Sequence, residues 1–176
     1  ESHVAVMGPN FQFQVWGRSS ERADSVVNEM SKICGIERVD DLESSVRDAD
    51  IIVTITGSTA PLVLSDWVKP GTHITAVGAD APGKQELEVA LVEKADVLVA
   101  DHIEQCVDHG EISRFVQTDD TRKSIIVELG QVLNNAKLGR RNDSQITIAD
   151  QTGIAACDIA ISQSVLNSWT KNLNKT

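Results

Sequence analysis

Aromatic and basic residues are scarce in this sequence. Aromatics make up 3% of the chain, and tyrosine is absent. Proteins that bind single-stranded nucleic acids stack the bases on aromatic side chains, so that class of function is not expected here. Lysine and arginine together number 16 against 26 acidic residues, which gives a net charge of -10. Because such a surface repels phosphates, we expect neither nucleic acid nor a membrane as a partner.

Cysteines and long apolar runs are also few. Cys34, Cys106 and Cys157 are odd in number and widely spaced, and no two of them form a CxxC pair. That pattern fits a reducing compartment better than a disulfide framework. The apolar runs are far shorter than a membrane-spanning helix, and the first residues (ESHVAVMG) lack the basic start and long apolar region of a signal peptide. We therefore expect a soluble, acidic, cytoplasmic protein.

Strand-like and helix-like segments alternate along the 176 residues. β-Branched runs predict the strands, and apolar residues at helical spacing predict the helices between them. The alternation predicts an α/β fold with a doubly wound, mostly parallel sheet and a long C-terminal helix. The predicted strands are 3–7, 13–16, 36–39, 51–55, 74–78, 97–100, 124–127 and 145–149, and the main predicted helices are 19–34, 41–48, 86–93, 102–116 and 153–173.

The first predicted strand and its turn begin like a dinucleotide-binding fingerprint. Residues 3–7 (HVAVM) run into Gly8, and such sites need glycine in the turn before the helix that holds the pyrophosphate. However, five residues separate Met7 from Phe13, whereas neighbouring parallel strands need a crossover of about a dozen residues. The first βαβ unit is therefore incomplete. Gly8 is either a cofactor-binding glycine or an ordinary turn glycine.

Arg18, Ser19 and Ser20 follow the second predicted strand, where a dinucleotide fold meets the adenosine ribose. An acidic residue there suits the ribose hydroxyl of NAD, whereas an arginine suits the 2′-phosphate of NADP. A guanidinium and two hydroxyls therefore favour NADP(H) as the cofactor. The alternative is a surface arginine next to a serine that caps the following helix.

Thr56, Gly57 and Ser58 follow the uninterrupted apolar run 51–55, which predicts a strand buried on both faces. Small residues at the end of such a strand let a cofactor approach the backbone. An ordinary turn between a strand and a helix has the same composition, so both interpretations remain open.

The stretch Ile74–Leu87 (ITAVGADAPGKQEL) carries the strongest signal of a functional site. A predicted strand ends at Gly78, and then come Asp80, a Pro-Gly break and Lys84. Gln85–Leu87 are predicted to open a helix. Ligands of parallel α/β sheets bind just beyond the carboxyl ends of the strands, so an acid and a base in this loop favour a site. A plain surface ion pair is the alternative.

His102, Cys106 and His109 would lie on one face of a predicted helix, at i, i+4 and i+7. Histidine and cysteine are good zinc ligands, so this spacing allows a metal-dependent activity. No second cluster of metal-binding residues supports it, and a buried cysteine at position 106 explains the pattern as well. We therefore expect no metal.

Several segments resemble a known family, in the same order and over nearly the whole chain, from about Phe13 to Trp169. Together they resemble the carboxyl-terminal half of the ornithine cyclodeaminase/μ-crystallin family. GADAPGK together with DHIEQCVDHGEIS also suggests the family's branch linked to ectoine utilisation. The segments are VWGRSSERA, DADIIVTITGS, ITAVGADAPGKQEL, ADVLVAD, HGEI, ELGQVL and ITIADQTGIAACDIA.

This resemblance implies a Rossmann-like domain that binds NAD(P), with redox chemistry at an amino acid or a cyclic imino acid. In the family's cyclodeaminases, hydride leaves the substrate's α-carbon for the nicotinamide, an imine forms and ammonia is lost. Asp80 corresponds to the catalytic acid/base, which shuttles protons at the amine or the attacking water. Some members have serine where this chain has Gln151. The implied cofactor-binding residues are Gly8, Arg18, Ser19, Thr56, Gly57, Ser58, Val77, Lys84, Asp150 and Gln151.

Family members also carry an amino-terminal domain for substrate binding and dimerisation, which this sequence does not match. We expect residues 1–152 to form the NAD(P)-binding domain. The helix within 153–176 should pack on the absent domain or on a second copy, which predicts a homo-oligomer such as a dimer. Whether the chain is an enzyme stays open. The alternative is a truncated, non-catalytic module that oligomerises or binds another partner.

Overall fold

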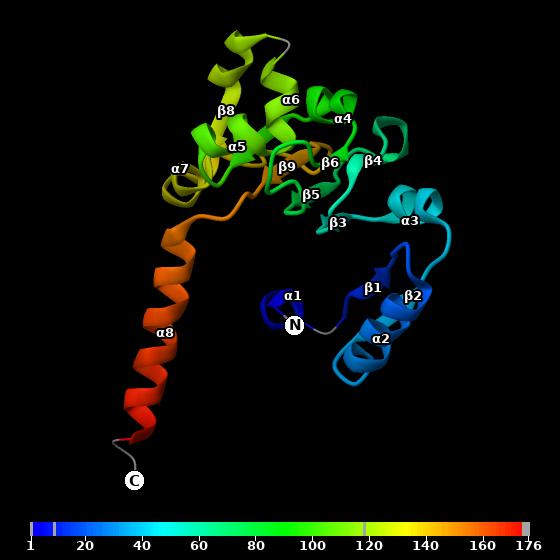
Figure 1. The fold of residues 1–176 in the computed structure, drawn as a ribbon, viewed down its shortest axis with the longest axis vertical. Coiled ribbons are helices and arrows are strands. Elements are labelled where there is room, and N and C mark those ends of the chain that lie inside the picture. The colour runs from blue at the N-terminus through cyan, green and yellow to red at the C-terminus, as the bar shows by residue number, and fades with distance from the viewer. Residues whose placement is uncertain (1, 9, 118, 174–176) are drawn as a thin grey trace. The chain divides into compact units, whose positions relative to one another are not determined.

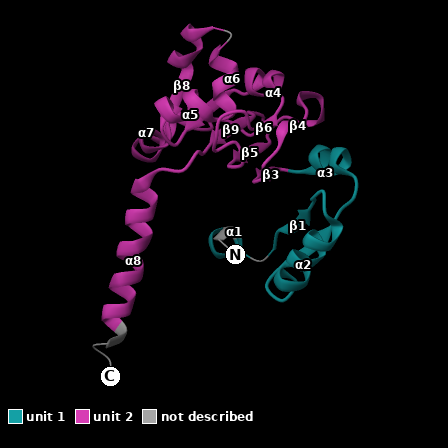
Figure 2. Ribbon diagram, in the orientation of Figure 1, with its two compact units in different colours: residues 1–49 teal, residues 50–176 magenta. Residues whose placement is uncertain are grey.

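The structure is a computed structural model that describes residues 2–8, 10–117 and 119–173 (Figure 1). Contacts between residues divide the chain into two compact units, with unit 1 at residues 1–49 and unit 2 at residues 50–176 (Figure 2). Each unit contains its own parallel sheet. The prediction that residues 1–152 form one domain stays a prediction.

Unit 1 is a βαβ unit preceded by a short helix. Its two strands pair in parallel, and the helix α2 connects them. The Ser19 Oγ accepts a hydrogen bond from the Arg22 backbone N at 3.3 Å, and so caps the first turn of α2. The elements are α1 (Ser2–Met7), β1 (Gln12–Val15), α2 (Ser20–Met30), β2 (Gly35–Arg38) and α3 (Leu42–Asp48).

The first segment is a helix, so the prediction of a strand at residues 3–7 is wrong. Gly8 ends α1: its backbone N donates to the Val4 carbonyl O at 2.9 Å, and its φ is 87°. Glycine is favoured there because it adopts this left-handed conformation without strain. Glycine can follow a strand at a turn, and it can also follow the last residue of a helix. The β-branched residues favoured a strand, whereas the segment is a helix. The short connection from Met7 to Phe13 therefore does not join two parallel strands.

Unit 2 is built on a five-stranded parallel sheet with the strand order β3-β5-β9-β7-β8. Helices flank this sheet (Figure 1), which confirms the predicted α/β fold with a mostly parallel sheet. Two further short strands, β4 and β6, pair with each other. The elements are β3 (Ile51–Thr54), β4 (Thr59–Val63), β5 (His73–Ala76), β6 (Gln85–Leu87), α4 (Val89–Lys94), β7 (Val97–Ala100), α5 (Ile103–His109), α6 (Glu111–Gln117), β8 (Ile126–Glu128), α7 (Leu129–Asn134), β9 (Thr147–Asp150) and α8 (Ala155–Leu173), with 3-10 turns at Ser65–Trp67, Asp120–Ile125 and Ala136–Leu138.

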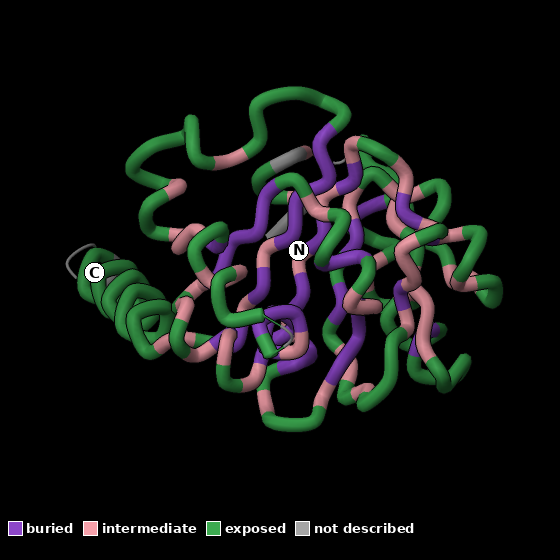
Figure 3. Tube along the Cα trace, turned by 90° about the horizontal axis from the view of Figure 1, so that it is seen from above, coloured by how far each residue is buried: buried purple, intermediate pink, exposed green. Residues whose placement is uncertain are grey.

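Buried residues concentrate in the strands of unit 2 (Figure 3). Ile74 of β5 and Ile148 of β9 are almost fully buried, and β7 is buried along its whole length. β3 differs, because it lies at the edge of the described sheet and its Val53 side chain is 43% exposed. The prediction that residues 51–55 are buried on both faces is therefore wrong. An edge strand has a neighbour on one side alone, which leaves part of it uncovered.

Residues 85–87 form strand β6, so the prediction that they open a helix is wrong. Gln85 pairs with Thr59 and Leu87 with Val63 of β4. The backbone N atoms of Glu86 and Leu87 donate to the distant Glu111 side chain. These long-range partners hold the chain extended, and the helix α4 begins after them at Val89.

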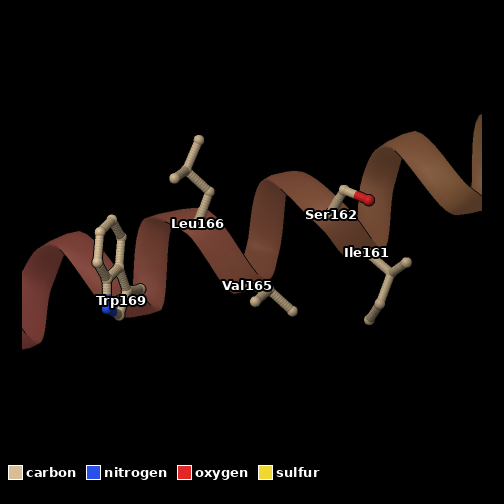
Figure 4. Close-up of a pocket in the computed structure, with 5 residues that line it drawn as sticks. All are labelled: Ile161, Ser162, Val165, Leu166 and Trp169. Atoms are coloured by element: carbon tan, nitrogen blue, oxygen red, sulfur yellow. The ribbon is translucent and has the colours of Figure 1, made fainter.

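Each described residue of the last helix, α8, is exposed from residue 155 to residue 171. Its apolar side chains Ile161, Val165, Leu166 and Trp169 line a shallow hollow together with Ser162 (Figure 4). Each of these four apolar side chains is more than half exposed. No helix among the described residues has the length and hydropathy needed to cross a membrane.

Candidate active site

The predicted site residues of unit 2 follow strands of one parallel sheet. Residues 56–58 come after β3, residues 77–84 come after β5, and β9 ends at Asp150, with Gln151 next. Because parallel strands end at the same edge of a sheet, the structure brings these three segments together there. A hydrogen bond from the Gln151 backbone N to the Ala76 carbonyl O, at 2.8 Å, joins two of them directly.

Asp80 and Lys84 form an ion pair across the loop after β5. The loop turns tightly between them: the Lys84 backbone N donates to the Ala81 carbonyl O at 3.2 Å, and Gly83 has a φ of 84°. The Lys84 ammonium donates to the Asp80 carboxylate and so lowers the pKa of that carboxyl group below its usual range. The side chains are 52% and 32% exposed, so both remain accessible to a ligand. At neutral pH Asp80 is therefore a carboxylate, which can accept a proton.

Glu86 joins the two loops that carry the candidate residues. Its side chain is fully buried; Oε1 accepts from the Thr56 backbone N at 2.5 Å, and Oε2 accepts from the Gly78 backbone N at 2.9 Å. Gly78 has no room for a side chain, because a Cβ there would collide with the Thr56 carbonyl O and with Glu86 Oε2. The sequence prediction missed Glu86. β6 reads Gln85-Glu86-Leu87, so no local pattern marked this glutamate as a buried acceptor.

The Asp150 side chain is directed into the protein. It is 1% exposed, and its Oδ2 accepts from the Ile112 backbone N at 2.9 Å. Burial raises the pKa of this carboxyl group to about 7, despite the backbone N–H groups of α6 that it accepts from. Asp150 was predicted as a cofactor contact, and its side chain here holds the start of α6 against the end of β9.

The other three predicted cofactor-binding residues, Gly8, Arg18 and Ser19, belong to unit 1. Ser19 caps α2, which is the alternative that the sequence left open, and Arg18 lies exposed in the turn between β1 and α2. The Gly8 backbone N–H is used by the helix that it ends. A phosphate-binding glycine of a dinucleotide site follows a strand, whereas Gly8 follows the helix α1.

His102, which precedes α5, and Cys106 and His109 within it do not form a metal-binding group. Cys106 is buried, its thiol donates to Asp101 Oδ1 at 3.2 Å, and burial raises the pKa of the thiol to about 12. The His109 ring nitrogen contacts the Asp108 carboxylate instead, at 3.0 Å. Across the described residues, no cluster of three or more metal-binding side chains is found.

Comparison with known proteins identifies the family. The model of the ornithine cyclodeaminase/mu-crystallin family matches residues 5–172. The chain is 35% identical over 161 residues to an uncharacterized cyclodeaminase of Sinorhizobium fredii. The matched region covers 90% of this chain and 49% of that protein. The chain thus spans about half the length of the curated relatives it matches.

Two solved structures share the fold. One is the iminosuccinate reductase of Paracoccus denitrificans in complex with NAD+, at 33% identity and a TM-score of 0.83, over 94% of this chain and 51% of that one. The other is an archaeal alanine dehydrogenase dimer with bound NAD, at 34% identity and a TM-score of 0.81, over 93% of this chain and 51% of that one. The chain belongs to the ornithine cyclodeaminase/mu-crystallin family.

Proposed function

We propose that this chain is the cofactor-binding part of an NAD(P)-dependent oxidoreductase that acts on an amino acid or a cyclic imino acid. The observation that carries the proposal is the accessible Asp80–Lys84 pair at the carboxyl edge of the parallel sheet, next in space to the loop 56–58. Relatives that act on imino acids or amino acids, namely an iminosuccinate reductase and an alanine dehydrogenase, support the substrate class.

The residues at the sheet edge fit a dinucleotide. The space in front of Gly57 is open, since a Cβ built there meets nothing within 4 Å, so a ligand can approach the backbone. The Thr56 hydroxyl accepts from the Ser58 backbone N at 3.2 Å, which shapes the loop around that opening. Thr56, Gly57, Ser58 and Val77 would contact the nicotinamide half, with Lys84 and the backbone at Gln151. When bound, the cofactor supplies hydride transfer.

Asp80 is the proposed proton-handling residue. As a carboxylate it takes a proton from the substrate amine while the carbon–nitrogen bond is oxidised, and it returns the proton when an imine is reduced. Lys84 keeps it ionised between these steps. The open position of the pair leaves room for a substrate beside it.

In this proposal Arg18 decides between NADP(H) and NAD(H). It follows strand β1, where dinucleotide folds contact the adenosine ribose. The two solved relatives carry NAD, whereas an arginine at this position favours the 2′-phosphate of NADP(H). Fluorescence titrations of the chain with NADPH and with NADH test it. We expect NADPH to bind more tightly, and Arg18→Ala to weaken NADPH about 10- to 100-fold, the worth of a charged hydrogen bond, with little effect on NADH.

Arg22→Ala, an exposed arginine in the first turn of α2, is the matched control and should leave both affinities unchanged. Equal affinity for the two nucleotides would remove the NADP preference and leave the dinucleotide site in place. If neither nucleotide binds, the oxidoreductase proposal is wrong.

A second candidate is a module whose role is association. The exposed apolar hollow on α8 favours it, because a monomer would leave that surface in water. The two candidates are compatible, since a cofactor-binding unit can also dimerise through this helix. A cytoplasmic location remains part of the proposal, supported by three cysteines that are all free.

A further inference from the structure

Three buried carboxyl groups connect the loops of the candidate site, and the function proposed above uses none of them. Glu86, Glu111 and Asp150 are each 3% exposed or less. None of the ion pairs among the described residues includes any of the three. Instead, each side chain accepts backbone N–H groups from a different part of the chain. Buried carboxyl groups are costly, so this arrangement calls for an explanation.

Glu86 closes the loop that carries Asp80 and Lys84. The loop leaves β5 at Gly78 and returns in β6 at Glu86, and the bond from the Gly78 backbone N to Glu86 Oε2 joins these two ends, eight residues apart. The other oxygen holds Thr56, the first residue of the loop after β3. One side chain therefore fixes the base of both loops.

Glu111 in turn fixes Glu86. Its two oxygens accept from the backbone N atoms of Glu86, at 2.5 Å, and Leu87, at 3.1 Å. Asp150 then binds the next backbone N of α6, that of Ile112. The chain of contacts runs from the end of β9, through the start of α6, to β6 and finally to the loops after β3 and β5.

Two glycines show that this arrangement is closely fitted. A Cβ at Gly78 would collide with Glu86 Oε2, and a Cβ at Gly110 would collide with Asp150 Oδ2. The carboxyl oxygens thus fill the space that side chains at these positions would need. Both collisions are with atoms of the same group of three carboxyl side chains.

We propose that Glu86 is the positioning residue of the active site: its buried carboxyl group locks the loop that carries Asp80 and Lys84 to the loop 56–58. This inference rests on the proposed function for its catalytic consequence, and on the hydrogen bonds above for its structural part. Glu86 acts through other residues, because its side chain is fully buried and cannot touch a substrate.

Amide hydrogen exchange of the wild-type chain gives the first measurement. Thr56 and Gly78 lie beyond the ends of β3 and β5, so unlocked loops would exchange their amides quickly. We expect both amides to be protected like those in the middle of β5, and the Gly57 amide to exchange much faster. Fast exchange at Thr56 and Gly78 in the wild type would overturn the proposal without any variant.

Glu86→Gln gives the second measurement. The amide keeps the shape but replaces one acceptor oxygen with a donor NH2 group, so the Thr56 or the Gly78 N–H loses its partner. We expect exchange at these two amides to rise at least about tenfold, since a lost hydrogen bond to a charged group is worth that much. Cofactor affinity, read by fluorescence, should fall by a similar factor.

Glu88→Gln is the matched control, because Glu88 follows the same strand and also accepts a backbone N–H, from Ser65 at 2.7 Å. It should lower the melting temperature without changing exchange at Thr56 and Gly78 or the affinity for the cofactor. If Glu86→Gln behaves like Glu88→Gln, the role of Glu86 is stability alone and the proposal is overturned. A wild-type chain that binds no nucleotide would refute the proposed function, while the exchange data would still decide the locking.

Discussion

At the scale of single residues, the state of Asp80 depends on one neighbour. The Lys84 ammonium lowers the pKa of Asp80 by a direct hydrogen bond, and desolvation opposes this effect without cancelling it. An acid/base group works best when its pKa lies near the working pH. A substrate that drew Lys84 away or shielded the pair from water would raise the pKa of Asp80, and so make it a better proton acceptor.

Lys84→Met tests this dependence. It removes the ammonium and keeps a long apolar stem, so we expect the pKa of Asp80 to rise toward the ordinary aspartate value of 3.8, as measured by NMR titration of the carboxyl carbon. Lys123→Met removes an equally exposed lysine from its pair with Glu104 and should leave Asp80 unchanged. An Asp80 pKa that does not respond to Lys84→Met would contradict the assigned cause.

The residue scale also shows what a sequence can predict about a site. The positions of Asp80, Lys84 and residues 56–58 were predictable, because strand ends in a parallel sheet converge by geometry. Glu86 and Glu111 were not predictable: their side chains act on backbone atoms 25 residues away, or 30 in the bond to Thr56. A local pattern contains no trace of such partners. The catalytic role of Asp80 and the cofactor contacts of all the other predicted site residues remain predictions.

At the scale of secondary-structure elements, the errors in the sequence prediction share a cause. α1 looked like a strand because its β-branched residues and closing glycine fit both elements, and a six-residue helix shows too few turns to decide. β6 looked like the start of α4 because its hydrogen-bond partners are in β4 and at the start of α6. The longer helices α2 and α8, by contrast, were located to within a few residues.

α6 is attached to the rest of unit 2 through carboxyl groups whose protonation should affect stability. Burial raises the pKa of Glu111 to about 7, and Asp150 and Glu86 are the charged neighbours that raise it further. In the unfolded chain a glutamate has a pKa of about 4.3, so between these values the folded state retains a proton that the unfolded state has released. The contribution of Glu111 to stability is therefore full at low pH and is lost as the pH rises to about 7.

Urea unfolding between pH 5 and pH 8 checks this sign. We expect the urea midpoint to decrease as the pH rises through this range, and Glu111→Gln to have a flatter dependence although it is less stable at pH 5. Glu104→Gln, an exposed member of an ion pair, should keep the wild-type slope. A wild-type midpoint that increases steadily with pH would show that Glu111 is ionised in the folded protein throughout.

At the scale of the whole molecule, the chain matches about half the length of its relatives. Its last helix, α8, has only exposed residues from 155 to 171. Burial of an exposed apolar side chain is worth about 1.5 to 3 kcal/mol, so four of them on one helix provide a strong drive to associate. A helix of 19 residues with no covering layer is also marginal by itself, because most helical stability in proteins comes from packing. We therefore expect this surface to be covered by a second copy.

Size-exclusion chromatography with light scattering tests the expected dimer. Trp169→Glu places a charge in the lining of the hollow and should shift the chain from dimer to monomer at micromolar concentration, while the urea unfolding of the sheet in unit 2 stays the same. Asn167→Glu adds the same charge to α8 at a residue outside the lining of the hollow, and should leave the dimer intact. Dimerisation through α8 requires the two variants to differ. A wild-type monomer, or a dimer that survives Trp169→Glu, would mean that two copies of this chain do not pair through that surface.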